Sequence, residues 1–191
     1  TSKLTRKSWN NSRDEPRRAL MALRMIGLDP GLRRTGWGVI EVDGSNLVHV
    51  ASGEVASTVS LPLAERLSQL FDALSGVIEA FGPTEAAVEE TFVNKNPSST
   101  LKLGQARGAV MLAPAQAGIP VAEYPANLIK KSLVGNGHAD KRQVQTMVSV
   151  LLPGAKPKSA DASDALAIAI CHAHHRRPPN VRYDFPKKVR V

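Results

Sequence analysis

Carboxylates stand at several points of this sequence where they could bind a divalent cation. Asp29 ends an apolar run and is followed by Pro-Gly, and Glu89 ends the short apolar run 86–89. A carboxylate at the end of a buried strand is costly unless it is paired or coordinates a metal. Asp161 and Asp164 are three residues apart at the start of a helical pattern, so they share one helix face. Such oxygen ligands suit Mg²⁺ or Mn²⁺, and two such ions can activate water and stabilise the leaving oxygen in phosphodiester cleavage.

Each of these positions also has a simpler interpretation. Strand side chains alternate between faces, so Glu89 and its neighbour Glu90 cannot both point at one site, and periodicity alone does not decide between them. Aspartates in the first turn of a helix are stabilised by the backbone dipole, and Ser159 or Asp161 is suited to cap the helix. Taken alone, the pair Asp161 and Asp164 is more typical of capping than of chemistry.

Three histidines close together offer a different metal site. His172, His174 and His175 lie near the end of the last helical pattern, directly before two arginines. Their spacing spreads them around a helix, so they are read mainly as cations at a helix C-terminus, with a histidine metal site as the weaker alternative.

Charge is divided unevenly along the chain. The 191 residues carry a net charge of +8, yet residues 25–90 hold three basic and ten acidic side chains, whereas residues 91–160 hold nine basic and two acidic. This division suits a protein that binds metal cations beside a polyanion such as nucleic acid. The single cysteine, Cys171, excludes a disulfide scaffold and fits a reducing cytoplasm. No apolar run reaches the roughly 18–20 residues of a membrane span, so we expect a cytoplasmic protein without membrane contact.

The elements that must position these carboxylates follow from hydrophobic periodicity and from turn residues. Apolar runs predict strands at 23–29, 35–42, 47–55, 86–89 and 119–124. Helical spacing predicts helices at 60–81, 100–113, 126–134, 140–152 and 160–175. Serines before Thr100 are suited to cap the second helix, and Pro114 should kink or end it. The order predicts an α/β fold in which an antiparallel meander of three strands is continued by parallel crossover strands.

Five sequence blocks in order carry a family resemblance: IGLDPGLRRTGWGVI, VEETFVNKN, LKLGQARG, DKRQVQTMV and SADASDALAIAI. They resemble the RuvC-type Holliday-junction resolvases over about residues 25–175. The resemblance implies a ribonuclease H-like fold and a homodimer that binds four-way DNA junctions. It implies Mg²⁺-dependent, symmetric cleavage of two strands of like polarity, leaving 5′-phosphate and 3′-hydroxyl ends, and the RuvA–RuvB branch-migration complex as a partner.

The resemblance also implies roles for individual residues. The family's four acids fall on Asp29, Glu89, Asp161 and Asp164, which favours Glu89 over Glu90. Its junction-centre aromatic residue falls on Phe92, and its basic residues near the scissile phosphate fall on Lys141 and Lys130. Basic side chains of the second half of the chain are expected to contact phosphates: Lys102, Arg107, Lys130, Lys131, Lys141, Arg142, Lys156 and Lys158.

The expected organisation is an N-terminal extension (1–22), a nuclease domain (23–175) and a basic tail (176–191). Two rival interpretations remain. A sugar-kinase or actin-type ATPase also has an aspartate and glycine after its first strand, but it needs two related lobes, which 191 residues without a repeat cannot supply. The other rival is a non-catalytic module that binds branched DNA on the same fold.

Overall fold

Five strands form one mixed sheet in the order β3-β2-β1-β4-β5 in the computed structural model, which describes residues 23–90 and 96–176. The strands are β1 (Leu23–Asp29), β2 (Arg34–Asp43), β3 (Asn46–Ala56), β4 (Glu85–Glu89) and β5 (Val121–Tyr124). Strands β1, β2 and β3 pair antiparallel, whereas β4 runs parallel to β1 and β5 parallel to β4. The predicted meander with parallel crossover strands is confirmed.

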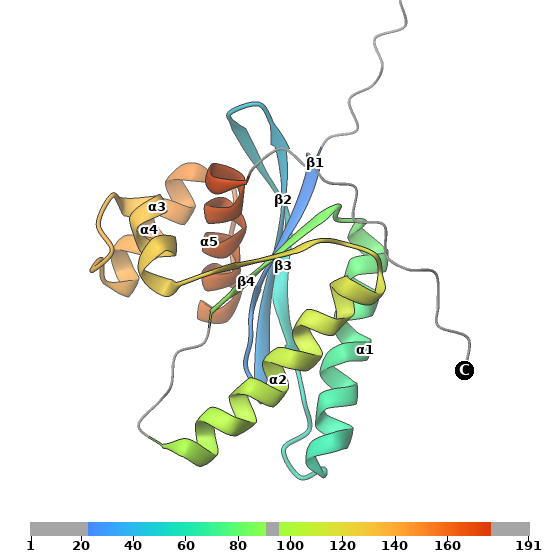
Figure 1. The fold of residues 1–191 in the computed structure, drawn as a ribbon. Coiled ribbons are helices and arrows are strands. Elements are labelled where there is room, and N and C mark those ends of the chain that lie inside the picture. The colour runs from blue at the N-terminus through green and yellow to red at the C-terminus, as the bar shows by residue number, and fades with distance from the viewer. Residues whose placement is uncertain (1–22, 91–95, 177–191) are drawn as a thin grey trace, which may run out of the picture.

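Helices cover both faces of this sheet (Figure 1). On one face lie α1 (Leu63–Phe81) and α2 (Pro97–Gln116); on the other lie α3 (Ala126–Val134), α4 (Lys141–Leu151) and α5 (Ala160–His175). Each face has its own apolar core. Met25 of β1 packs with Leu166 of α5 in one core, and Leu28 of β1 packs with Leu74 of α1 in the other. Alternate residues of β1 therefore face opposite helical layers.

Local sequence signals explain where several elements begin and end. Gly44 and Ser45 make the two-residue turn between Asp43, which ends β2, and Asn46, which begins β3, and Gly44 has a φ of 59°. Asp140 caps α4 in a reciprocal capping box with Gln143, as its position before the helical pattern indicates. The αL conformation of Gly82 ends α1.

Helix α2 departs from the prediction at both ends. It begins at Pro97, and the side chain of Asn96, in place of a serine, accepts hydrogen bonds from the backbone of Ser98 and Ser99. The helix also continues past Pro114 to Gln116. Pro114 lies in the last turn, where few helical hydrogen bonds follow it, and its ring is buried, so the helix tolerates the missing N–H donor. Within the described residues, no helix is both long and apolar enough to cross a membrane.

Candidate active site

Two neighbouring parallel strands bring Asp29 and Glu89 to the same edge and the same face of the sheet. β1 and β4 pair from Met25↔Glu85 to Leu28↔Val88, so their final residues emerge side by side. Val88 packs in the core under α1 and α2, whereas Ala87 packs in the core under α5. Side chains alternate along a strand, so Glu89 shares the α5 side with Ala87. Asp29 shares this side with Met25 by the same alternation.

Glycines of β1 and β2 let α5 lie unusually close to the sheet. A Cβ on Gly27 would lie 2.1 Å from the carbonyl oxygen of Ala165, and a Cβ on Gly38 would lie 2.7 Å from the Leu166 side chain. A Cβ on Gly36, the residue paired with Asp29, would lie 2.0 Å from the carbonyl oxygen of Asp161. These glycines therefore seat the first turn of α5 against the end of β1. Glycine on alternate positions of a strand was the available sequence signal for this close approach.

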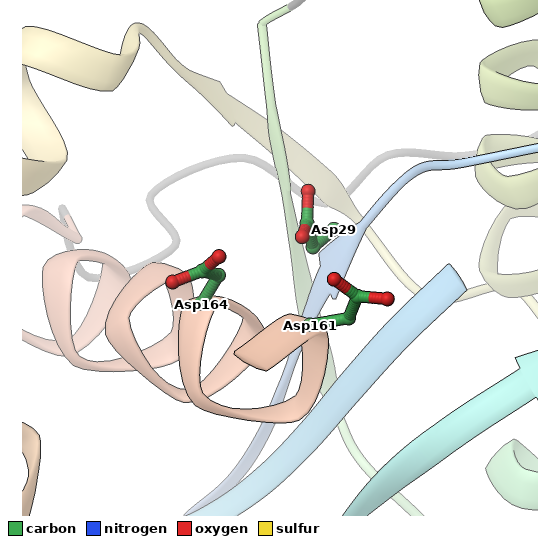
Figure 2. Close-up of side chains that lie close together, drawn as sticks. All are labelled: Asp29, Asp161 and Asp164. Carbon is green, nitrogen blue, oxygen red and sulfur yellow. The ribbon is translucent and has the colours of Figure 1, made fainter. Parts of the chain in front are cut away.

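Three aspartates converge as a result, and they are called the aspartate cluster here. One carboxylate oxygen from each of Asp29, Asp161 and Asp164 lies within 4.8 Å of the other two. Figure 2 shows Asp29 at the end of β1, with Asp161 and Asp164 on the first turns of α5. Ser159 caps this helix by accepting a hydrogen bond from the backbone of Ala162. Ser159 performs the capping function, so neither aspartate is needed as the cap.

The cluster concentrates negative charge in a partly buried place. Burial raises the pKa of Asp29 to about 7 from an ordinary 3.8, and the negative charges of Glu89 and the other two aspartates add to this shift. Burial likewise raises the pKa of Glu89, with a further contribution from Asp164. Oxygen ligands that are hard, close together and short of positive charge fit Mg²⁺ or Mn²⁺. Among the described residues, these aspartates are the only group of three or more histidine, cysteine or acidic side chains close enough together to hold one metal ion.

Two lysines border the acids. Lys141, the first residue of α4, donates a hydrogen bond from Nζ to Asp164 Oδ2 at 2.7 Å, and this bond is the main cause of its raised pKa. Lys130 of α3 lowers the pKa of Glu89 through its charge. Both lysines line a cavity of about 260 Å³ with Glu89 and Asp164, over an apolar floor that α3, α4 and α5 provide. This cavity places cations next to the carboxylates, where a phosphate would need them.

The loop that follows Asp29 is fixed by hydrogen bonds that the sequence did not reveal. Thr35, fully buried, donates to the carbonyl oxygen of Gly31 and accepts from its N–H. The carbonyl oxygen of Leu32 accepts hydrogen bonds from Ser57 and from Arg66 of α1. The loop therefore has little freedom, and the backbone that carries Asp29 is fixed on both sides.

The remaining candidates differ in where they lie. Phe92 is outside the described residues. Five further basic side chains are exposed, on α2, α3, α4 and the linker before α5: Lys102, Lys131, Arg142, Lys156 and Lys158. Arg107 is different, because its guanidinium points inward to the ends of β4 and β5, where it donates to the Glu89 carbonyl oxygen and pairs with Glu123. These partners are groups of the protein itself, so they argue against the predicted role of Arg107 as a phosphate contact.

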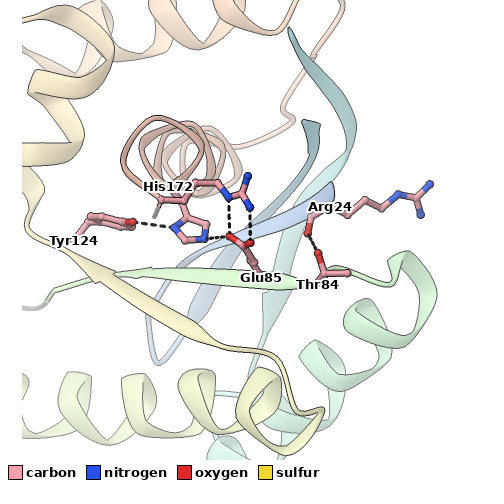
Figure 3. Close-up of polar contacts among 6 residues, drawn as sticks. Arg24, Thr84, Glu85, Tyr124 and His172 are labelled. Carbon is pink, nitrogen blue, oxygen red and sulfur yellow. Dashed lines mark hydrogen bonds and ion pairs between the residues drawn. The ribbon is translucent and has the colours of Figure 1, made fainter. Parts of the chain in front are cut away.

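The three histidines near the end of α5 contact different partners. His172 is buried, with Nδ1 2.8 Å from the Tyr124 hydroxyl and Nε2 2.9 Å from Glu85 (Figure 3). Burial lowers the pKa of His172, while the charge of Glu85 opposes this shift, so the surroundings favour the neutral ring over the predicted cation. His174 contacts Ser132 and His175 contacts the backbone of its own helix. This arrangement anchors α5 to β4 and does not gather the three rings around one ion.

Comparison with known proteins identifies the family. A family model described as crossover junction endodeoxyribonuclease RuvC matches residues 25–172. The protein of this name from Xanthobacter autotrophicus is 65% identical over 157 residues, covering 82% of this chain and 93% of the relative. Its counterpart in Rhodospirillum rubrum is 64% identical over 154 residues, covering 81% of this chain and 91% of the relative.

Solved structures agree with the sequence comparisons. The structure of Thermus thermophilus RuvC in complex with a Holliday junction substrate matches with a TM-score of 0.74 and 34% identity, covering 79% of this chain and 93% of that chain. A yeast mitochondrial Holliday junction resolvase shares the fold, with a TM-score of 0.57 at 13% identity. The ribonuclease H-like fold is confirmed. The chain belongs to the RuvC family of crossover junction endodeoxyribonucleases.

Proposed function

We propose that this protein resolves four-way DNA junctions as a Mg²⁺-dependent endodeoxyribonuclease. It cuts two strands of like polarity symmetrically and leaves 5′-phosphate and ligatable 3′-hydroxyl ends. The observation that carries this proposal is the convergence of Asp29, Asp161 and Asp164, with carboxylate oxygens within 4.8 Å of one another, beside the ammonium group of Lys141. A purely DNA-binding module has no need for a half-buried aspartate whose pKa is raised to about 7, because removing that charge from water destabilises the fold.

The acids would hold the metal, and the neighbouring residues would hold the DNA strand. Asp29, Glu89, Asp161 and Asp164 are the proposed ligands of two Mg²⁺ ions, for which Mn²⁺ could substitute. Bound ions of this kind lower the pKa of an attacking water and stabilise the departing 3′-oxygen. Lys141 stabilises the negative charge that develops on the phosphate. The paired ends of β1 and β4 hold the backbone of Asp29 and Glu89 in place.

DNA binding is assigned to exposed cations around this site. Lys102 of α2, Lys131 of α3 and Arg142 of α4 are exposed, and a junction arm that crosses the cavity of Lys130 and Lys141 could meet them. Phe92, which follows Glu89 by three residues in the sequence, is proposed to stack on an unpaired base at the crossover.

A homodimer is proposed because symmetric cutting needs two active sites, and α2 offers a surface for it. Leu101 is 66% exposed and Leu112 is 48% exposed, and eleven residues place them on one face of the helix. Gly104 and Gly108 lie between them, and neither would meet an atom within 4 Å of an added Cβ. Exposed apolar side chains around a flat stripe suit a two-fold contact. The RuvA–RuvB complex is the proposed partner on the junction, with the cytoplasm as the proposed location.

A cleavage assay tests the function directly. The wild-type chain, with Mg²⁺ and a synthetic four-way junction, should release paired, nicked duplexes that ligase can seal, whereas a linear duplex of the same sequence should stay intact. Asp29→Asn should bind the junction and not cut it. Binding without any cutting by the wild-type chain, in Mg²⁺ and in Mn²⁺, would support a non-catalytic junction-binding module instead.

A further inference from the structure

Arg107 carries its charge from α2 to the edge of the sheet where Glu89 lies. Its side chain is only 19% exposed. Nε donates a hydrogen bond to the backbone carbonyl oxygen of Glu89 at 3.2 Å, and the end of the guanidinium pairs with the carboxylate of Glu123 on β5. One side chain thus joins α2 to the last residue of β4 and to β5.

The peptide that follows Glu89 is consequently held from two sides. The N–H of Glu90 donates to the carbonyl oxygen of Tyr124 at 2.9 Å, which ties this peptide to β5. The carbonyl oxygen of the same peptide accepts from Arg107. Together the two bonds fix the peptide plane next to the Glu89 Cα, and the direction in which the Glu89 side chain leaves the strand depends on that backbone.

We propose that Arg107 is a positioning residue for Glu89, which it holds in the orientation that the acidic site requires. This inference rests on the proposed function, in which Glu89 is a metal ligand. Arg107 itself touches neither the aspartate cluster nor the cavity beside it. It acts through the backbone of the ligand, as residues around metal sites commonly orient the groups that bind the ion.

The same contacts argue against a role for Arg107 as a phosphate anchor. The carboxylate of Glu123 compensates its charge, and little of its surface faces solvent. A cation that contacts a DNA phosphate raises the salt dependence of binding, because each contact releases counterions. Loss of Arg107 should leave that salt dependence unchanged, which separates the two roles experimentally.

Arg24 supplies a matched control within the same chain. It donates from Nε to the Glu41 carboxylate at 3.2 Å and from a terminal nitrogen to the Phe81 carbonyl oxygen at 2.9 Å. These are the same kinds of contact as those of Arg107, but Arg24 is at the start of β1 and Asp29 at its end. Figure 3 shows Arg24 beside Thr84, next to Glu85 at the start of β4. Arg24→Met therefore removes an equivalent anchor without touching the site.

The experiment compares Arg107→Met with Arg24→Met in the full chain. Calorimetric titration with Mn²⁺ measures metal affinity without DNA, and single-turnover cleavage at varied Mg²⁺ measures the rate. Arg107→Met should lower metal affinity and rate by about 10- to 100-fold, as loss of a group that orients a metal ligand does. The junction affinity of Arg107→Met in EDTA should stay within about twofold of the wild-type affinity at each of two salt concentrations. Arg24→Met should retain the wild-type metal affinity, cleavage rate and junction affinity. Arg107→Lys should recover part of the loss, because lysine can make one of the two contacts.

Several results would overturn the proposal. A weaker junction affinity with a shallower salt dependence would make Arg107 a phosphate contact, and equal losses in Arg107→Met and Arg24→Met would make it an ordinary stabilising residue. If Arg107→Met does not fold, Glu123→Gln keeps the guanidinium but removes its partner; unchanged metal affinity in that variant would also count against the proposal. Glu89→Gln separates this inference from the proposed function. If Glu89→Gln cuts the junction normally, Glu89 is not a metal ligand and the proposed function fails at that residue. If Glu89→Gln is inactive but Arg107→Met is unaffected, only the positioning role of Arg107 is refuted.

Discussion

Lys141 Nζ is 2.7 Å from Asp164 Oδ2, so a cation of the protein itself rests against a proposed metal ligand. The pair is accessible, with 56% of the lysine side chain and 28% of the aspartate side chain exposed. The charge of Lys141 also acts to lower the pKa of Asp29, but burial and the neighbouring carboxylates raise that pKa by more. A metal ion that binds Asp164 must displace this lysine or share the carboxylate with it, and the displaced ammonium becomes free to meet a phosphate.

Replacement of Lys141 should therefore have opposite effects on metal binding and on cleavage. At pH 8, Lys141→Met should bind Mn²⁺ more tightly in the absence of DNA, by about fivefold, because an exposed charge at this distance is worth roughly 1 kcal/mol. Cleavage of the junction should become slower, since the phosphate loses its neighbouring cation. Calorimetry and single-turnover kinetics measure the two effects. Weaker Mn²⁺ binding in the variant would show that Lys141 does not compete with the metal.

Asp29 should destabilise the metal-free protein at alkaline pH. Its pKa in the folded state is about 7 against an ordinary 3.8, so the folded chain holds a proton that the unfolded chain releases between about pH 4 and pH 7. This contribution to stability is present at low pH and is lost as the pH rises through 7. Asp29→Asn, which carries no charge, should therefore be more stable than wild type at pH 8 in EDTA, by at most about 4 kcal/mol, with the difference shrinking toward pH 4.

Thermal unfolding across this pH range checks the prediction for Asp29. Added Mg²⁺ should raise the melting temperature of the wild-type chain more than that of Asp29→Asn, because the ion stabilises the folded state in proportion to its affinity. If Asp29→Asn is less stable than wild type at pH 8 without metal, the charged Asp29 carboxylate makes a stabilising contact that outweighs the cost of its burial, and the prediction is wrong.

Much of the site could be predicted because strand ends and helix starts leave clear marks in a sequence. Asp29 ends an apolar run before Pro-Gly, and Asp161 and Asp164 share a helix face by spacing alone. The choice between Glu89 and Glu90 could not be made from the residues, because the run before them is too short and too uniformly apolar to show alternation. The structure gives Glu89 the α5 side because Ala87, two residues earlier, packs in that core.

The direction of Arg107 could not be predicted, for a different reason. A basic residue on a helix faces solvent or the sheet depending on how the helix docks, and small residues surround Arg107 on much of α2. The acceptor on Glu89 is a backbone oxygen, which every residue has, so no sequence pattern marks it. The surroundings of His172 could not be predicted either, since its partners Tyr124 and Glu85 come from two other strands.

The exposed face of α2 should control the oligomeric state. Leu112→Glu puts a charge into the proposed two-fold contact, and we expect a monomer by light scattering and loss of paired cuts in a junction. Val150→Glu is the control, because Val150 is 61% exposed on α4, on the other layer of the fold. It should leave the dimer intact. A dimer that persists in Leu112→Glu would move the interface to another surface.

Close packing of α5 on the sheet should prove essential to the aspartate cluster. In Gly36→Ala, the new methyl group would lie 2.0 Å from the carbonyl oxygen of Asp161, so the first turn of α5 must move away from β2. We expect a loss of about 1–3 kcal/mol in the free energy of unfolding, as overpacking of a close contact causes. Displacement of Asp161 from Asp29 should also weaken Mn²⁺ binding and abolish cleavage.

Gly76→Ala is the matched control, since Gly76 lies in α1 with no atom within 4 Å of an added Cβ. This substitution should be neutral or stabilise the protein by about 0.5–1 kcal/mol. Equal Mn²⁺ affinity in Gly36→Ala and Gly76→Ala would show that the acids tolerate a shifted helix, contrary to the geometry on which the proposed metal site depends.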